Sequence, residues 1–188
     1  MTALSLARFS DIFSVTKAPV DEDSLWEKVK SAVEGALSEF IKMREVEGEK
    51  LKADVLSRAD AIIENVAYIE ERSPETVKAY SEKLLERMKT VLGDTQVDES
   101  RILTEAAIYA DKVAVAEETV RLRSHIDQLH TMLDSDEAVG RKLDFLVQEI
   151  NREANTIGSK AQDVDIARRV IDIKAEVEKI REQIQNIE

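Results

Sequence analysis

Glu149 and Glu153 stand four residues apart in a segment with the hydrophobic periodicity of a helix. On an α-helix this spacing places both carboxylates one turn apart on one face, where they can bind a hard divalent cation and leave other positions for water and phosphate. The same spacing is common in charged helices. Glu149 could instead pair with Arg152 or Lys142, and Glu153 could pair with Lys160. The spacing alone favours these ion pairs over a metal site.

Asp111, Glu118 and His125 recur every seven residues along a helix predicted over residues 99–133. The three therefore lie along one flank of the apolar stripe of that helix, with Arg121 close by. An imidazole beside a carboxylate can act as a general acid or base, or as a metal ligand. The alternative is a boundary histidine that is hydrogen-bonded to Glu118 or Arg121, which is the commoner role of a lone histidine.

Residues 140–161 combine a regular apolar stripe with polar side chains on both of its flanks. The stripe consists of Leu143, Leu146, Val147, Ile150, Ala154, Ile157 and Ala161. The polar residues on the two flanks are Lys142, Asp144, Glu149, Asn151, Glu153, Asn155 and Lys160, with Gln148 and Arg152 further out. A helix whose polar residues only face solvent does not need so many hydrogen-bonding groups beside its core. The segment is therefore the best candidate for a site.

The chain is acidic overall, with 27 Lys and Arg, 39 Asp and Glu, and a net charge of −12 over 188 residues. Such a protein repels phosphate backbones at long range, which argues against a general nucleic-acid coat. Residues 140–161 depart from this balance, since four basic residues (Arg141, Lys142, Arg152 and Lys160) outnumber three acidic ones. Arg121 and Arg123 would extend this basic strip, which would suit a phosphodiester or a partner protein.

The composition predicts an all-α fold, because aromatic residues make up only 4% of the chain and there are five Gly and two Pro. The periodicity predicts an irregular, connector-like segment over residues 1–23 and one helical domain over 24–188. The expected helices, about 24–72, 74–92, 99–133, 140–162 and 165–187, form long antiparallel hairpins with coiled-coil-like packing. Ser73-Pro74 marks the restart of a helix, and residues 93–98 are expected to form a turn. No segment has the length and apolar character of a membrane span.

Several stretches resemble the YicC-like (YicC/YloC) endoribonuclease family. Residues 140–161 are similar to its signature block, and residues 43–54 (MREVEGEKLKAD) match its arginine–glutamate–glycine motif. Residues 110–126 and the terminal KAEVEKIREQIQNIE fit the same pattern. The resemblance is ordered along the chain and covers nearly all of residues 24–188, which is more specific than any single spacing.

The resemblance implies a bacterial, cytoplasmic endoribonuclease that depends on a divalent metal, Mn²⁺ or Mg²⁺, and assembles as a hexamer around RNA. It points to His125 and Glu118 on one helix, and on the next to Lys142, Asp144, Gln148, Glu149, Arg152, Glu153 and Asn155. We expect Glu149, Glu153 and Glu118 to bind the metal and, with His125, to form the catalytic set. The expected RNA-binding residues are Arg121, Arg123, Arg141, Lys142, Arg152 and Lys160. The expected supporting polar residues are Asp111, Asp144, Gln148 and Asn155.

Family members carry an additional, strand-containing N-terminal domain, which this chain is predicted to lack. That absence would impair RNA capture and assembly, and with them the activity. The alternative function is a non-catalytic helical scaffold or oligomerisation module, in which the polar flanks form subunit contacts. A regulator that binds RNA or a nuclease without cutting is a further alternative.

Overall fold

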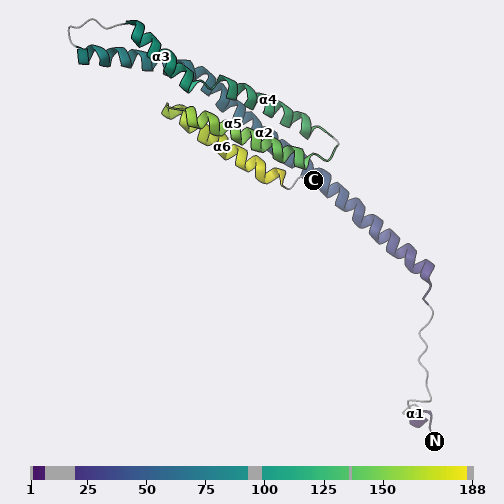
Figure 1. The fold of residues 1–188 in the computed structure, drawn as a ribbon. Helices are drawn as coiled ribbons and strands as arrows, with labels where there is room; N and C mark the ends of the chain where they lie inside the picture. The colour runs from purple at the N-terminus through teal and green to yellow at the C-terminus, as the bar shows by residue number, and fades with distance from the viewer. Residues whose placement is uncertain (1, 7–19, 93–98, 136, 186–188) are drawn as a thin grey trace. The chain divides into compact units, whose positions relative to one another are not determined.

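The computed structural model describes residues 2–6, 20–92, 99–135 and 137–185. All regular structure within these ranges is helical, which confirms the predicted all-α fold (Figure 1). The helices are α1 (Ala3–Leu6), α2 (Glu22–Leu92), α3 (Glu99–Val113), α4 (Ala116–Leu133), α5 (Gly140–Lys160) and α6 (Val164–Ile184). Within the same ranges no helix is both long and apolar enough to cross a membrane. The turn predicted over 93–98 lies outside the described residues.

The chain divides into two compact units, Met1–Val46 and Glu47–Glu188. The first unit contains α1 and the first part of α2, so the segment predicted as irregular includes one short helix. The described side chains from Val20 to Val46 are exposed, including Trp26 at 62% and Phe40 at 50%. In this unit the apolar residues at helical spacing therefore face outward.

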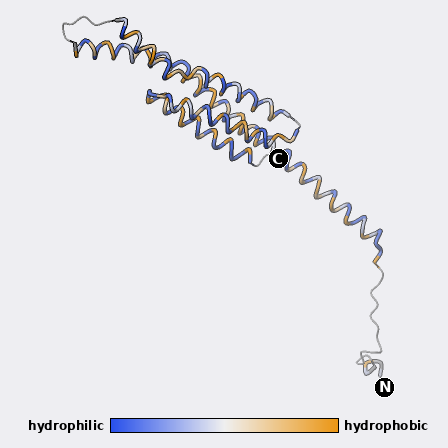
Figure 2. The backbone as a smooth tube through the Cα atoms, viewed as in Figure 1, coloured by the Kyte–Doolittle hydropathy of each residue, from blue (hydrophilic) through white to orange (hydrophobic). Residues whose placement is uncertain are grey.

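The second unit has a continuous apolar core to which α2, α4, α5 and α6 contribute. In each of these helices the buried residues recur at steps of three and four, as one stripe of a helix requires. Those of α2 are Val55, Ala59, Ile62, Val66 and Ile69, all fully buried. Figure 2 shows hydrophobic positions recurring along each helix. Burying one such aliphatic side chain contributes about 1.5–3 kcal/mol, so this stripe is a main source of stability.

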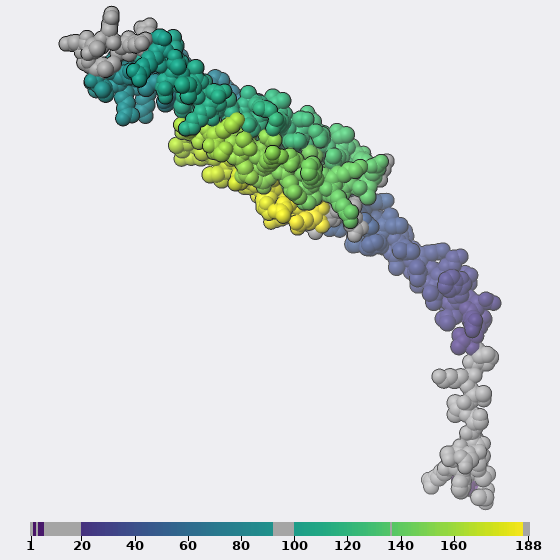
Figure 3. Space-filling model, viewed as in Figure 1, coloured from purple at the N-terminus to yellow at the C-terminus, as the bar shows by residue number. Residues whose placement is uncertain are grey.

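Helix α5 packs against both α4 and α6, and lies between them on the face shown in Figure 3. Gly158 in α5 explains part of the close approach to α6. A Cβ added at this glycine would lie only 3.0 Å from Cγ1 of Val170. At the start of α6, the Asp163 carboxylate accepts hydrogen bonds from the backbone amides of Asp165 and Ile166, at 2.9 and 3.1 Å, and caps the helix.

Charged pairs attach α2 to the other helices of the second unit. Each joins an arginine to a carboxylate on another element: Arg58–Glu176 at 3.0 Å, Arg123–Glu70 at 2.7 Å and Arg72–Asp163 at 3.3 Å. Their side chains are partly exposed, so each pair adds little energy by itself. Because they connect different helices, they fix which faces of the helices meet.

Helix α2 continues through Pro74, so the predicted break at residues 73–74 is wrong. Proline lacks a backbone N–H and therefore removes one hydrogen bond from the helix. Beyond the proline, the ring of Tyr80 stacks on Tyr109 of α3, with centroids 3.7 Å apart.

The single helix predicted over 99–133 is instead two helices, α3 and α4, separated at Ala114 and Val115. Val113 and Val115 are both buried, at 6% and 4% exposure. Two residues that are two positions apart point to nearly opposite sides of a continuous helix, so a helix with a single buried face would expose one of them. The interruption allows both to be buried. Lys160 of α5 donates a hydrogen bond to the Ala114 carbonyl at 2.8 Å. In a continuous helix this carbonyl would instead accept a hydrogen bond from the backbone N–H four residues later.

Candidate metal centre between α4 and α5

His125 of α4 and Glu149 and Glu153 of α5 form one cluster. A ligand atom from each lies within 4.8 Å of those of the other two. The spacing of the two glutamates places both carboxylates on the flank of α5 that meets α4, as the sequence predicted. His125 and Glu149 are half-buried, whereas Glu153 is only 5% exposed. The cluster thus lies at the edge of the core and remains reachable from solvent on one side.

Two guanidinium groups lie beside these carboxylates. Nη1 of Arg121 is 3.8 Å from Oε1 of Glu153, and Nη1 of Arg152 is 3.5 Å from Oε2 of Glu149. Carboxylates this close repel each other, and the positive charges offset that repulsion. Both distances exceed those of a normal N–H···O hydrogen bond, so the arginines supply charge without occupying the carboxylate lone pairs fully.

His125 has an unsatisfied nitrogen. Its Nδ1 is buried and makes no hydrogen bond to any described residue. A buried polar atom without a partner costs on the order of 1–3 kcal/mol, so such atoms are rare unless a ligand satisfies them. An imidazole with two carboxylates is a donor set that divalent metals accept, and the residues present therefore fit a metal ion.

Glu118 is not a member of the cluster. Its buried carboxylate accepts a hydrogen bond from Nζ of Lys160 at 2.8 Å, and its Oε2 has no partner among the described residues. Glu118 and His125 share one flank of α4 but are seven residues apart, which is about 10 Å along the helix axis. The structure therefore brings together three of the four predicted catalytic residues and separates Glu118 from them.

The residues predicted to bind RNA fall into two groups. Arg123 forms a two-point pair with Glu70, at 2.7 and 3.1 Å, and this hydrogen bonding lowers the pKa of the Glu70 carboxyl. Lys160 is likewise held by Glu118. These two basic residues therefore stabilise helix packing, and the prediction that they bind RNA has no support in their contacts.

Arg121, Arg141, Lys142 and Arg152 are exposed and lie around the cluster. Within the described ranges, Lys142 pairs with the exposed Glu137, at 3.2 Å, and Arg121 also pairs with Glu117 of its own helix. Such exposed pairs exchange readily with other charged partners. These four residues are therefore available to a ligand.

The predicted supporting residues also separate. Asp111 is exposed on α3, before the interruption, and is not part of the cluster. Gln148 donates to Asp144 at 2.9 Å, and Asn155 donates to Asn151 at 2.8 Å. Both pairs lie on α5.

A hollow of about 380 Å³ adjoins the cluster and shares His125 and Glu149 with it. Its other lining residues are Gln128, Met132, Arg141, Lys142, Phe145 and Leu146. Phe145 is 64% exposed, which is unusual for a large aromatic residue. Phe145 was not among the residues predicted for the site, although its place outside the apolar stripe indicates that it does not belong to the core.

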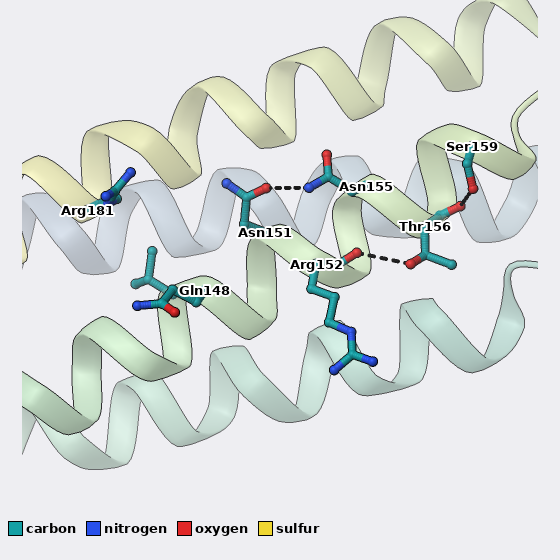
Figure 4. A pocket seen from close by; sticks show the side chains of 8 residues that line it. Gln148, Asn151, Arg152, Asn155, Thr156, Ser159 and Arg181 are labelled. Carbon is teal, nitrogen blue, oxygen red and sulfur yellow. Dashed lines mark hydrogen bonds between the residues drawn. The ribbon is translucent and has the colours of Figure 1, made fainter.

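A second hollow, here called the polar groove, runs along the other flank of α5 (Figure 4). It is lined by Val147, Gln148, Asn151, Arg152, Asn155, Thr156, Ser159 and Arg181. Arg181 comes from α6, and no sequence pattern connects it with α5. Figure 4 shows Arg152 extending from α5 on the opposite side from the Asn151–Asn155 pair.

The helical unit that carries the cluster is shared with known proteins. Residues 69–188 match the family model described as "Endoribonuclease YicC-like, C-terminal", and residues 1–53 match "Endoribonuclease YicC-like, N-terminal region". The chain belongs to the YicC-like endoribonuclease family, as its sequence motifs predicted. The prediction that the N-terminal domain is lacking is not supported, because residues 1–53 match that region.

Two curated relatives are similar over most of the chain. The "Probable endoribonuclease YicC" of Clostridioides difficile is 46% identical, over 100% of this chain and 64% of its own length. The protein of the same name from Haemophilus influenzae is 36% identical, over 89% of this chain and 58% of its own length. The chain thus spans about three fifths of the length of these relatives.

Proposed function

We propose that this chain is the helical part of a divalent-metal-dependent endoribonuclease whose metal is bound by His125, Glu149 and Glu153. The observation that carries the proposal is the convergence of one imidazole and two carboxylates, with arginines at the edge of the cluster. The relatives are named as endoribonucleases, which makes RNA the proposed substrate. Oxygen ligands suit Mn²⁺ and Mg²⁺ alike, and the imidazole favours Mn²⁺.

The bound metal would activate water and stabilise the negative charge that develops on a phosphodiester. The side chains of this chain supply the rest. Glu153 is buried, so the surrounding core fixes its position. Glu149 is half-buried and faces the adjoining hollow. Arg121 and Arg152 contact the carboxylates loosely, so they can turn to a phosphate when a cation neutralises the carboxylates.

The same charge arrangement accounts for RNA binding by an acidic chain. Without a cation, the two carboxylates offset the two arginines, and the rest of the chain repels RNA. A bound divalent cation leaves a local excess of positive charge, which Arg141 and Lys142 at the adjoining hollow increase. We therefore expect RNA binding near the cluster to depend on the metal. The family resemblance further implies a hexamer in the bacterial cytoplasm, which we adopt as part of the proposal.

One observation favours the alternative function, an oligomerisation module. In the unit Met1–Val46 the exposed residues include Leu25, Trp26, Leu37, Phe40 and Ile41, each at least 50% exposed. Exposed apolar side chains in such number are typical of surfaces that bind other proteins. Oligomerisation and RNA cleavage are compatible, because the exposed apolar residues of this unit and the residues of the metal cluster do not overlap.

The test is cleavage of a labelled RNA by the purified chain with Mn²⁺ or Mg²⁺, compared with the variants Glu149→Gln and Glu153→Gln. Both variants should abolish cleavage, while the Tm stays unchanged or rises because two repelling carboxylates become one. Glu64→Gln, the same substitution at an exposed position of α2, is the matched control and should remain active. Retained cleavage in both cluster variants would refute the proposed site. An inactive wild-type chain whose cluster variants fail to fold or assemble would support the scaffold.

A further inference from the structure

The polar groove has a lining that differs in charge from the rest of this acidic chain. Among the described residues that line it there is no acidic one; they are two arginines, three residues with amide side chains, two with hydroxyl groups, and Val147. Its volume is about 490 Å³, which is enough for a small part of a polar ligand. In a chain with a net charge of −12, a hollow without acidic lining is suited to an anion.

The neutral groups of the groove are arranged mainly to accept hydrogen bonds. Thr156 donates its hydroxyl proton to the Arg152 carbonyl at 3.1 Å, and Ser159 donates to the Thr156 carbonyl at 2.8 Å (Figure 4). Both hydroxyl oxygens can therefore only accept a further bond. The pair of Asn151 and Asn155 uses one polar atom of each amide and leaves one donor and one acceptor for a ligand. A ribose 2′-hydroxyl can donate to such acceptors, whereas a phosphate cannot.

Arg152 connects the groove with the metal centre. Its guanidinium lies 3.5 Å from Glu149 of the cluster, and its side chain also lines the groove. The two sites are therefore on opposite flanks of α5 with Arg152 between them. The body of one helix is only about 10–12 Å wide, so a single RNA strand can reach both.

From this arrangement we infer that the polar groove binds the ribose–phosphate backbone of the RNA strand next to the phosphate at the His125–Glu149–Glu153 cluster. Arg181 holds phosphate there, and the acceptor groups of α5 receive the 2′-hydroxyl. Arg181 is available for this role because its ion pair with Glu178, at 3.6 Å, is long and exposed. The inference rests on the proposed function, since it takes RNA as the substrate.

The decisive residue is Arg181, which lies outside the metal centre and can be changed without altering it. Arg168 of the same helix is a matched control. Both arginines are exposed and each pairs with an acid three residues earlier, Arg181 with Glu178 and Arg168 with Asp165, but only Arg181 lines the groove. Arg181→Gln and Arg168→Gln therefore change the net charge equally.

The measurement is the dissociation constant of a short fluorescein-labelled single-stranded RNA by fluorescence anisotropy, with Mn²⁺ under conditions that do not allow turnover and again in EDTA. Arg181→Gln should weaken binding about tenfold, as expected for one charge-assisted hydrogen bond, in both conditions. The logarithm of the association constant falls as the logarithm of the salt concentration rises, and this fall should become less steep by about 0.7, the value for one phosphate contact in a single strand. Arg168→Gln should leave both quantities unchanged.

Equal effects of the two variants, or no effect of either, would overturn the inference while leaving the metal centre intact. A change in sedimentation of the RNA-free protein in Arg181→Gln, without a specific loss of RNA affinity, would assign the groove to a contact between copies of the chain instead. Failure of the proposed function has a different signature, because Mn²⁺ would then bind wild type and Glu153→Gln alike in calorimetry. Absence of RNA binding by the wild-type chain in both conditions would overturn both proposals.

Discussion

Lys160 Nζ lies 2.8 Å from Oε1 of Glu118 and 2.8 Å from the carbonyl oxygen of Ala114. One ammonium group of α5 thus compensates a buried carboxylate of α4 and the carbonyl left open where α3 ends. Glu118 is 7% exposed, so its charge is separated from most of the surrounding water. The contact therefore contributes to the packing of α4 on α5 and explains why Glu118 does not reach the metal centre.

Replacing Lys160 with Met should destabilise the protein by about 3 kcal/mol, because it leaves the Glu118 carboxylate buried without a compensating charge. Urea unfolding followed by circular dichroism measures this loss. The double variant Glu118→Gln/Lys160→Met should recover much of the stability, since no buried charge remains. If the single variant loses no stability, or if the double variant loses as much as the single one, the pair does not hold the helices together.

Metal binding should stabilise the folded chain. A ligand that binds only the folded state at about one hundred times its Kd adds roughly 2.7 kcal/mol, so Mn²⁺ should raise the Tm and EDTA should reverse the rise. Differential scanning calorimetry with and without Mn²⁺ measures this shift.

Variants separate the ligands from their neighbours in the same experiment. Glu153→Gln should lose most of the Mn²⁺-dependent shift, because it removes a member of the cluster. Glu118→Gln should keep it, because Glu118 is bound to Lys160 instead. The opposite result would return Glu118 to the ligand set that the sequence predicted.

The all-α class and the buried stripes followed from the sequence, because three- and four-residue steps on a helix define one face whatever lies opposite. The cluster followed in part for the same reason, since Glu149 and Glu153 share a face. The Glu118 prediction was not supported because two residues on one flank can still be two turns apart. The spacing of residues on one helix shows which side of the helix they face. It does not show which turn of the helix lies opposite a given residue of the partner helix.

Features that depend on contacts between distant segments could not be predicted from local pattern. Ser73-Pro74 has the local chemistry of a helix start, yet α2 runs through it, and further along the helix Tyr80 stacks on Tyr109 of α3. The polar groove needs Arg181 of α6 beside α5, and this depends on how the helices pair. The burial of both Val113 and Val115, which interrupts the helix, likewise depends on the surrounding core.

The Glu70–Arg123 pair should make stability depend on pH at the acid end. Its hydrogen bond lowers the pKa of Glu70 below the ordinary 4.5, so the pair stabilises fully above that pH and its contribution is lost as the pH falls through the lowered value. The side chains are 35% and 37% exposed, so the effect should be about 1 kcal/mol or less. Glu70→Gln should lower the Tm at pH 7 and reduce its fall between pH 5 and about pH 3. Glu71→Gln, at an exposed neighbouring position, should leave the wild-type pH profile.

The continuity of α2 through Pro74 is testable by restoring the missing backbone donor. Inside a helix, proline is about 3 kcal/mol less favourable than alanine, and its stiffening of the unfolded chain offsets up to about 1 kcal/mol of this. Pro74→Ala should therefore stabilise the protein by roughly 2 kcal/mol in urea unfolding.

Ser73→Ala is an independent test of whether α2 is continuous through Pro74 or a new helix begins there. In a continuous helix the serine has no capping role, and alanine, the better helix former, should be neutral or slightly stabilising. If instead a new helix started at Pro74, Ser73→Ala would remove its cap at a cost of about 1 kcal/mol. Pro74→Ala would then bring no gain, because proline is well suited to the first position of a helix. One helix therefore predicts a gain of stability for Pro74→Ala and no loss for Ser73→Ala, whereas two helices predict no gain for Pro74→Ala and a loss for Ser73→Ala.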